Sequence, residues 1–153
     1  MEKIVIITGG NKGLGEGLSK VYHKNGYRVF SISRSIKEKF YTAEQYSCDL
    51  SKTETIAPTL TKVFSLLDIT STKKILLINN AGDLGTVNTI ENLNPKDINY
   101  TIQVNLIAPL ILSATFIKLA KEFNCKKEII NISSGAAINP YESWSLYCAS
   151  KAG

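Results

Sequence analysis

Cysteine, histidine and tryptophan are scarce in this chain of 153 residues, which contains three cysteines, one histidine and one tryptophan. The cysteines, Cys48, Cys125 and Cys148, are odd in number and widely spaced, so the sequence predicts neither a disulfide framework nor a zinc site. The single histidine, His23, has no partner ligand or acid near it, and we expect no metal site. This cysteine usage favours a reducing, cytoplasmic location.

The sequence also lacks a long uninterrupted apolar run. Apolar residues make up 44% of the chain, yet no stretch approaches the ~18 to 20 consecutive apolar residues of a membrane span. The first apolar run, at 4–7, is too short for a signal peptide and has no small-residue cleavage site behind it. The formal charge of +5 comes from scattered lysines, without a basic stripe that carries interleaved aromatic residues. We therefore expect a soluble protein with no membrane or nucleic-acid partner, in which some cations bind a negatively charged cofactor.

Short apolar, β-branched segments alternate along the chain with longer segments of helical spacing. Strands are predicted at 3–7, 27–33, 74–78 and 127–132, with a weaker one at 45–47. Helices are predicted at 13–25, 51–67, 95–105 and 108–123. Strands that are apolar on both faces suit a parallel sheet covered by helices on both sides. The sequence therefore predicts one open α/β sheet in a single domain over residues 1–153.

The chain ends just inside a further predicted helix, which starts near Tyr147 and reaches Gly153. A helix of barely two turns is marginal by itself. The apolar strand at 129–132 would also form an open sheet edge unless further strands pair with it. We therefore expect the sequence to be the N-terminal part of a longer enzyme.

A glycine-rich turn connects the first predicted strand to the first predicted helix. It contains, in order, Thr8, Gly9, Gly10, Asn11, Lys12, Gly13, Leu14 and Gly15. Where side chains are missing, backbone N–H groups can approach the pyrophosphate of a dinucleotide at the N-terminus of the helix. Taken alone, such a turn can also be no more than a tight connection between a strand and a helix. The strand before it and the helix after it favour dinucleotide binding.

No acidic residue follows the second predicted strand, where NAD-binding proteins usually carry one for the adenosine ribose. The sequence there is Ser31-Ile32-Ser33-Arg34. Arg34, together with Lys12 in the glycine turn, is suited to pair with the 2′-phosphate of NADP(H) through charge-assisted hydrogen bonds. Alternatively, both are ordinary solvated cations, which are common on any protein surface. The pattern favours NADP(H) over NAD(H) as the cofactor.

Tyr147 and Lys151 are four residues apart in the last predicted helix, so both lie on one helix face. A lysine ammonium beside the phenol favours its ionised form, whereas an ordinary phenol, with a pKa of about 10, is a poor acid–base catalyst at neutral pH. The pair alone is frequent by chance. Ser134, at the end of an apolar strand, and the glycine turn far upstream make the combination specific.

In this order, the motifs of the chain resemble those of the short-chain dehydrogenase/reductase family. The segment 8–15 matches the family's TGxxxGxG turn, Asp49-Leu50 matches a short motif that holds the adenine, and 79–82 matches the NNAG signature. Four residues fall where the family keeps its catalytic residues: Asn105, Ser134, Tyr147 and Lys151. The resemblance implies a doubly wound Rossmann fold with a parallel sheet of order 3-2-1-4-5, whose C-terminal strands are missing here.

The resemblance also implies the roles of these residues. Tyr147 would donate a proton to the carbonyl oxygen of the substrate as a hydride passes from the nicotinamide, and Ser134 would hydrogen-bond the same oxygen. Lys151 would lower the pKa of Tyr147 and hold the nicotinamide ribose, and Asn105 would fix a water that relays protons. Ser133 is the rival of Ser134, but the thirteen-residue step to Tyr147 matches the family for Ser134. The implied cofactor-binding set comprises residues 8–15, Ser33, Arg34, Asp49, Leu50, Asn80, Ala81, Gly82, Tyr147 and Lys151.

The segment 140–151 resembles the family branch that includes sepiapterin reductase and benzil reductase, in which aromatic residues before the catalytic tyrosine wall the pocket. Tyr141 and Trp144 are therefore candidates to stack on a flat diketone or a pterin. Packing of the loop onto the core is an equally good explanation of both side chains. The segment 83–92 matches no motif.

Two functions from different classes follow. The first is an NADPH-dependent carbonyl reductase, which interconverts a ketone and an alcohol, with the present chain as its cofactor-binding part. The second is a truncated, non-catalytic dinucleotide-binding or oligomerisation module. Residues 108–120 are apolar nearly all round, and in the family the corresponding helix packs both on the sheet and on a second subunit. The resemblance therefore implies a homodimer or a homotetramer.

Overall fold

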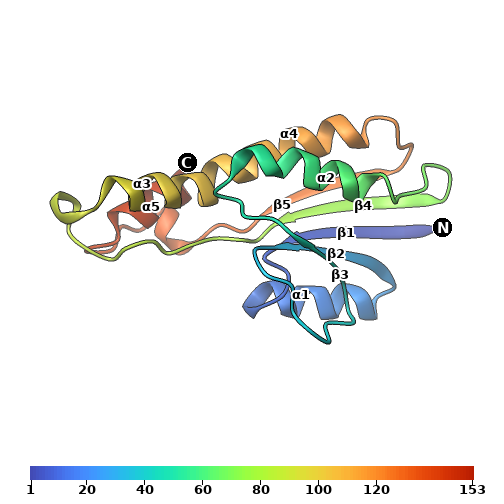
Figure 1. Ribbon diagram of the computed structural model, residues 1–153, viewed down its shortest axis with the longest axis horizontal. Coiled ribbons are helices and arrows are strands. Elements are labelled where there is room, and N and C mark those ends of the chain that lie inside the picture. The colour runs from blue at the N-terminus through green and yellow to red at the C-terminus, as the bar shows by residue number, and fades with distance from the viewer.

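Five parallel strands form one sheet, flanked by helices on both faces (Figure 1). The computed structural model describes residues 1–153, and its strands are β1 (Glu2–Thr8), β2 (Tyr27–Ser33), β3 (Glu44–Ser47), β4 (Thr72–Asn79) and β5 (Lys126–Asn131). Its helices are α1 (Gly13–Lys24), α2 (Ile56–Phe64), α3 (Pro95–Ile102), α4 (Ala108–Ala120) and α5 (Ser145–Ala152). The strand order is β3-β2-β1-β4-β5, with every neighbouring pair parallel. The predicted fold class and strand order are confirmed.

Alternate residues of the central strand β1 explain why helices cover both faces of the sheet. Ile4 and Ile6 belong to the larger core cluster, which also contains apolar side chains of α2 and α4. Val5 and Ile7 belong to a smaller cluster on the opposite face, which packs against Leu18 of α1. Figure 1 shows α1 on one side of the sheet and α2 and α4 on the other. Because β1 is apolar at consecutive positions, it is buried from both sides.

The helix after β3 is shorter than predicted. Its first turn is a 3-10 helix at Thr53–Thr55, and regular α-helix covers only Ile56–Phe64 of the predicted range 51–67. The side chain of Asp49 organises the entry to this segment, because its carboxylate accepts hydrogen bonds from the backbone N–H and the hydroxyl of Ser51.

One continuous helix, Pro95–Ala120, replaces the two helices predicted over 95–123. A π-helical turn at Gln103–Ile107 joins α3 to α4. Pro109 has no N–H to donate to the carbonyl four residues before it, and the wider turn lies just there. By length and hydropathy alone this helix is able to cross a membrane, although it contains no uninterrupted apolar run of that length. In the structure, Leu112 and Phe116 of this helix pack in the larger core cluster, against one face of the sheet.

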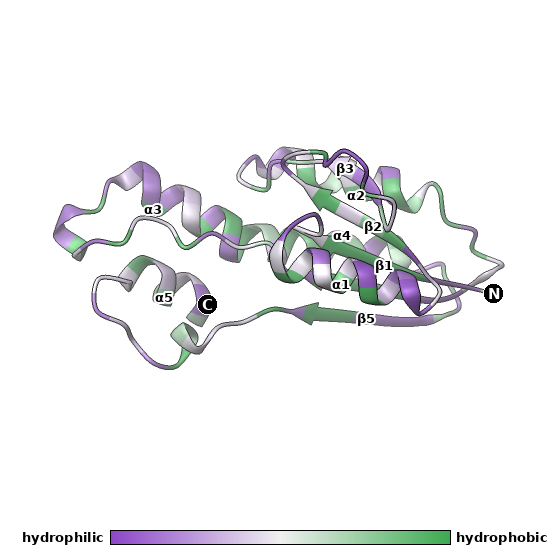
Figure 2. Ribbon diagram, turned by 90° about the horizontal axis from the view of Figure 1, so that it is seen from below, coloured by the Kyte–Doolittle hydropathy of each residue, from purple (hydrophilic) through white to green (hydrophobic).

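The C-terminal ends of the strands all point towards α3 and α5, which lie beyond the sheet at the end away from Met1 (Figure 2). The glycine turn follows β1 at this end, and the segment that follows β5 leads directly into α5. Parallel strands bring their following loops to one edge, where ligands of open α/β sheets bind. The fold therefore brings the predicted site segments to one edge of the sheet.

Candidate active site

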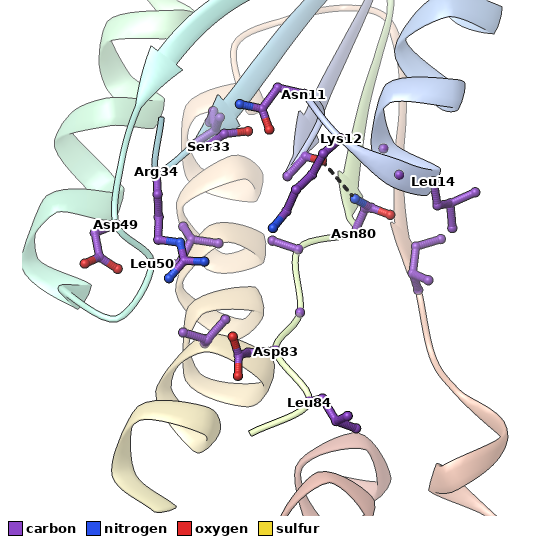
Figure 3. Close-up of a pocket in the computed structure, with 18 of the residues that line it drawn as sticks. Asn11, Lys12, Leu14, Ser33, Arg34, Asp49, Leu50, Asn80, Asp83 and Leu84 are labelled. Carbon is purple, nitrogen blue, oxygen red and sulfur yellow. Dashed lines mark hydrogen bonds between the residues drawn. The ribbon is translucent and has the colours of Figure 1, made fainter. Parts of the chain in front are cut away.

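A cavity of about 500 Å³ lies at the C-terminal ends of the strands, and Figure 3 shows the side chains of Lys12 and Arg34 pointing into the same space. Most of the predicted site residues line it: Gly9, Asn11, Lys12, Gly13, Leu14, Gly15, Ser33, Arg34, Asp49, Leu50, Asn80, Ala81, Gly82, Tyr147 and Lys151. The other predicted residues are not among its lining residues: Thr8, Gly10, Asn105, Ser134, Tyr141 and Trp144. The structure thus brings the glycine turn and the Tyr147–Lys151 pair to one cavity.

Glycine is required at different positions of the turn for two different structural reasons. A Cβ at Gly10 would lie 2.7 Å from Ser31 Oγ, and a Cβ at Gly15 would overlap the carbonyl oxygen of Gly9. These glycines are required by the packing of the turn against its own neighbours. At Gly13, with φ of +53°, a Cβ would meet nothing within 4 Å. The open space at this position, at the start of the 12-residue helix α1, fits the close approach of a phosphate.

Thr8 and Asn80 join the ends of β1 and β4 beneath the turn. The Thr8 hydroxyl accepts hydrogen bonds from the backbone N–H groups of Asn80 and Ala81, both at 3.0 Å. The side-chain amide of Asn80 donates to the Thr8 carbonyl at 2.9 Å. Thr8 is 1% exposed, so its side chain holds the turn in place and does not reach the cavity.

The far end of the cavity contains one fixed carboxylate and one cation without a carboxylate partner. Burial raises the pKa of Asp49, but hydrogen bonds from Ser51, together with the charges of Lys52 and Arg34, outweigh it, so the pKa lies below its ordinary value. The Arg34 guanidinium donates a hydrogen bond of 2.7 Å to the hydroxyl of Tyr100, a residue that sequence reasoning missed, and it forms no ion pair. Asp49 and Arg34 therefore form no direct ion pair.

Two lysines near Lys12 form ion pairs with a carboxylate, whereas Lys12 does not. Glu16, in the first turn of α1, forms ion pairs with Lys20 and with Lys37, both at 2.7 Å. The side chain of Lys12 forms no ion pair. Lys12 and Arg34, together with Lys151 on α5, are therefore cations of the cavity without an ion pair.

Tyr147 and Lys151 lie on the same face of α5, as their spacing predicts, and both line the cavity. The Lys151 ammonium lies 5.9 Å from the centre of the Tyr147 ring and donates a hydrogen bond of 3.1 Å to the Ile132 carbonyl. Burial lowers the pKa of Lys151. The Lys151 side chain thus lies between the end of β5 and the Tyr147 ring.

Two adjacent serines after β5 have different positions. Ser133 lines the cavity, whereas Ser134 begins a short 3-10 helix, and its hydroxyl oxygen accepts a hydrogen bond of 3.2 Å from the backbone N–H of Ala136. This bond uses the oxygen as an acceptor and leaves the hydroxyl proton free to donate. The catalytic role of Ser134 stays a prediction, with Ser133 as its rival.

Asn105 lies in the π-helical turn and is 7% exposed. Its side-chain amide donates to the Asp83 carbonyl at 2.7 Å and to the Ser150 hydroxyl at 2.8 Å, and its oxygen accepts from the Asp83 N–H at 2.8 Å. Ser150 in turn donates to the Tyr147 carbonyl. Sequence reasoning missed both Asp83 and Ser150, since neither belongs to a motif that it used. The Asn105 side chain thus links α5 to the segment after β4 through hydrogen bonds. Its role in holding a proton-relaying water stays a prediction.

Three aromatic rings form a row that ends at Tyr147. The ring centres of Tyr141 and Trp144 are 5.3 Å apart, and Trp144 packs edge-on against Tyr147 at 5.8 Å. The loop that carries them is joined to the segment after β4, because the Asn88 N–H donates to the Ser143 carbonyl at 3.0 Å. Trp144 therefore has a packing role, and Tyr141 remains 50% exposed.

These features define an α/β nucleotide-binding fold with a glycine turn and a Tyr–Lys pair at the same cavity. The chain belongs to the short chain dehydrogenase family, whose pattern it matches over residues 3–153.

Individual relatives agree with this assignment. A benzil reductase ((S)-benzoin forming) from Bacillus cereus is 38% identical over 159 aligned residues, which cover 99% of this chain and 64% of the reductase. A sepiapterin reductase from Xenopus tropicalis is 35% identical over 89 residues, which cover 56% of this chain and 34% of that protein. The crystal structure of a metagenomic short-chain oxidoreductase in complex with NADP has a TM-score of 0.85 and 29% identity, covering 97% of this chain and 69% of that one. The present chain thus spans about 64% of the length of the benzil reductase.

Proposed function

We propose that the protein is an NADPH-dependent carbonyl reductase, and that residues 1–153 form its NADP(H)-binding domain. One observation carries the proposal: the same cavity is lined by the glycine turn, by the cations Lys12 and Arg34, and by Tyr147 and Lys151. A dinucleotide has its phosphates near its middle and its reactive ring at one end. The phosphate-binding turn and the acid–base pair are arranged in one cavity as such a ligand requires.

The bound cofactor would supply the hydride for a ketone or accept it from an alcohol. Tyr147 would donate a proton to the developing alkoxide oxygen, with the Lys151 ammonium favouring the phenolate that remains. The free hydroxyl proton of Ser134 would stabilise the negative charge on the same oxygen. Lys151 would also hold the ribose next to the nicotinamide, since burial and its bond to Ile132 fix the position of its ammonium.

The preference for NADP(H) over NAD(H) is supported by the two cations and by the solved relative that binds NADP. A 2′-phosphate would make charge-assisted hydrogen bonds to Arg34, with Lys12 as a second cation. Arg34→Asp should therefore weaken NADPH binding at least about tenfold and reverse the preference towards NADH, since each hydrogen bond to a charged group contributes about 1.5 to 3 kcal/mol. Lys73→Asp makes the same charge change at the opposite end of the sheet and should leave the preference as it is. An unchanged preference in Arg34→Asp would place the phosphate elsewhere.

The proposed substrate is a flat diketone or the carbonyl side chain of a pterin. The names of the two relatives, a benzil reductase and a sepiapterin reductase, support this class. The exposed Tyr141, next to Trp144, offers an aromatic face beside the catalytic end of the cavity. Oxidation of NADPH by the full-length gene product should be measured with benzil, sepiapterin and simple diketones. Tight cofactor binding without turnover of any carbonyl would contradict the reductase and favour the non-catalytic dinucleotide-binding module.

Two further proposals concern assembly and location. The outer face of α4 carries Leu110 and Ile117, which are 62% and 64% exposed, and such apolar exposure supports a homodimer or homotetramer. Light scattering of the purified protein tests this, because Leu110→Lys together with Ile117→Lys should then lower the mass to that of a monomer. A reducing, cytoplasmic location is supported by the three free cysteines.

A further inference from the structure

The chain at Arg34 is fixed on both sides of the residue. The hydroxyl of Ser47, in β3, donates to the Arg34 carbonyl at 3.0 Å. The side-chain amide of Asn11, in the glycine turn, donates to the Ser35 carbonyl at 2.6 Å. The base of the long Arg34 side chain therefore has a defined position relative to the phosphate-binding turn.

The tip of the same side chain is fixed by a residue from another part of the fold. Tyr100, on α3, lines the cavity and accepts the 2.7 Å hydrogen bond from Arg34 Nη1. Asp49, the nearby carboxylate, is bonded to Ser51 instead. Arg28, by contrast, is saturated by Glu44 and by a backbone carbonyl. Arg34 is thus held by a neutral partner and forms no direct ion pair, although its charge acts on the Asp49 carboxylate from a distance.

This arrangement leaves the guanidinium able to bind an anion. A guanidinium has five N–H donors, and the bond to Tyr100 uses one of them. The remaining donors include the edge formed by Nε and Nη2, which suits bidentate binding of a phosphate. A free arginine side chain loses considerable rotamer entropy when it binds, whereas one that is already held loses less.

We propose that Tyr100 is a positioning residue that holds Arg34 for the 2′-phosphate and so contributes to the choice of NADP(H) over NAD(H). This inference depends on the proposed function, because it requires Arg34 to bind that phosphate. Tyr100 acts through Arg34 and does not itself bind the phosphate. Its contribution should equal that of one hydrogen bond at a partly exposed site, which is about three- to tenfold in affinity.

The test measures the binding of NADP⁺ and NAD⁺, which differ only in the 2′-phosphate, by isothermal titration calorimetry and without turnover. Tyr100→Phe keeps the ring and removes the hydroxyl, so it should weaken NADP⁺ binding about three- to tenfold and leave NAD⁺ binding unchanged. Tyr41→Phe is the matched control, because Tyr41 is 83% exposed and its hydroxyl has no hydrogen-bond partner in the structure. Equal losses for both cofactors, or unchanged or tighter binding of NADP⁺, would overturn the inference.

Arg34→Ala and the double variant with Tyr100→Phe separate this inference from the proposed function. If Tyr100 acts through Arg34, Tyr100→Phe should have no further effect in the Arg34→Ala background. A persistent effect there would mean that Tyr100 contacts the ligand directly, against the inference. If Arg34→Ala leaves NADP⁺ binding unchanged, or if the wild-type protein binds neither cofactor, the proposed function fails as well. If Arg34→Ala weakens NADP⁺ binding and Tyr100→Phe does not, only the role of Tyr100 is wrong.

Discussion

The two ends of the cavity are supported by strands of different burial. The glycine turn follows β1, which lies in the middle of the sheet and whose residues from Ile4 to Thr8 are all buried. The segment that leads to Tyr147 follows β5, which lies at the sheet edge and has no fully buried residue, with Ile130 39% exposed. Within residues 1–153, the glycine turn therefore follows a buried strand, whereas the segment that leads to Tyr147 follows an exposed one.

The contacts at the two ends differ in kind as well. At the turn, the missing side chains of Gly10 and Gly15 allow backbone and side chains to approach closely. At the other end, α5 is held by separate hydrogen bonds, from Lys151 to the Ile132 carbonyl and between Asn105 and Ser150. Close packing tolerates little change, while single hydrogen bonds contribute modestly. Changes at the turn should therefore affect folding and cofactor binding together, and changes on α5 should affect the reaction more than the fold.

The largest effect is expected from Tyr147→Phe. Loss of the proton donor should lower kcat by about 10²- to 10⁴-fold, whereas the ring stays packed against Trp144 and the affinity for NADPH should fall by no more than about tenfold, the effect of one hydrogen bond. Steady-state kinetics with a diketone and direct titration of NADPH measure the two quantities. If kcat falls less than about tenfold, another residue supplies the proton and the contrast between the two ends loses its basis.

The second prediction compares two glycines of α1. A Cβ at Gly15 would overlap the Gly9 carbonyl and lie 2.6 Å from Asn80 Nδ2, so Gly15→Ala should destabilise the protein by about 1 to 3 kcal/mol and weaken NADPH binding. At Gly17 a Cβ would meet nothing within 4 Å, and Gly17→Ala should be neutral or stabilising by up to about 1 kcal/mol. Denaturant unfolding measures both variants. Equal stability of the two would mean that the turn is less closely packed than the structure shows.

The sequence predicts the buried end of the molecule better than its margin. The strands β1 and β4 are recognisable because each contains four consecutive apolar residues, and β2 is recognisable because Val29, Phe30 and Ile32 lie close together in the sequence. The joining of α3 to α4 was not predicted, because the π-helical turn depends on the hydrogen bonds of the whole helix and leaves no clear pattern in the sequence.

The same difference applies to the site. Residues within short motifs, such as Asn80 and Lys151, line the cavity, and their roles stay predictions. Tyr100 and Ser150 were missed, since their partners Arg34 and Asn105 are distant in the sequence and meet them only in the folded chain. Tertiary hydrogen bonds of this kind are not encoded in local spacing.

The third prediction compares two serines of α5. Ser150→Ala removes a hydroxyl that accepts from Asn105 and donates to the Tyr147 carbonyl, and should destabilise the protein by about 1 kcal/mol and lower kcat a few-fold. The hydroxyl of Ser145 is buried without a partner, so Ser145→Ala should be neutral or slightly stabilising. Thermal unfolding and steady-state kinetics distinguish the pair. A larger loss in Ser145→Ala would show that the bonds of Ser150 do not hold α5.

The smallest effect should appear at the phosphate-binding end, as a dependence of stability on pH. Hydrogen bonds from Lys20 and then Lys37 lower the pKa of Glu16 from 4.5 to about 2, which ties the loop after β2 to α1. Because the folded pKa is lower than the unfolded one, the stabilisation is fully present above pH 4.5 and is lost as the pH falls towards about 2. Glu16→Gln should therefore lower Tm slightly at neutral pH, and the difference in Tm from the wild-type protein should shrink to nothing near pH 2. Glu122→Gln changes a residue without an ion pair and should show no such trend. A difference that stays constant from neutral pH to pH 2 would mean that the ion pairs of Glu16 do not stabilise this end of the cavity.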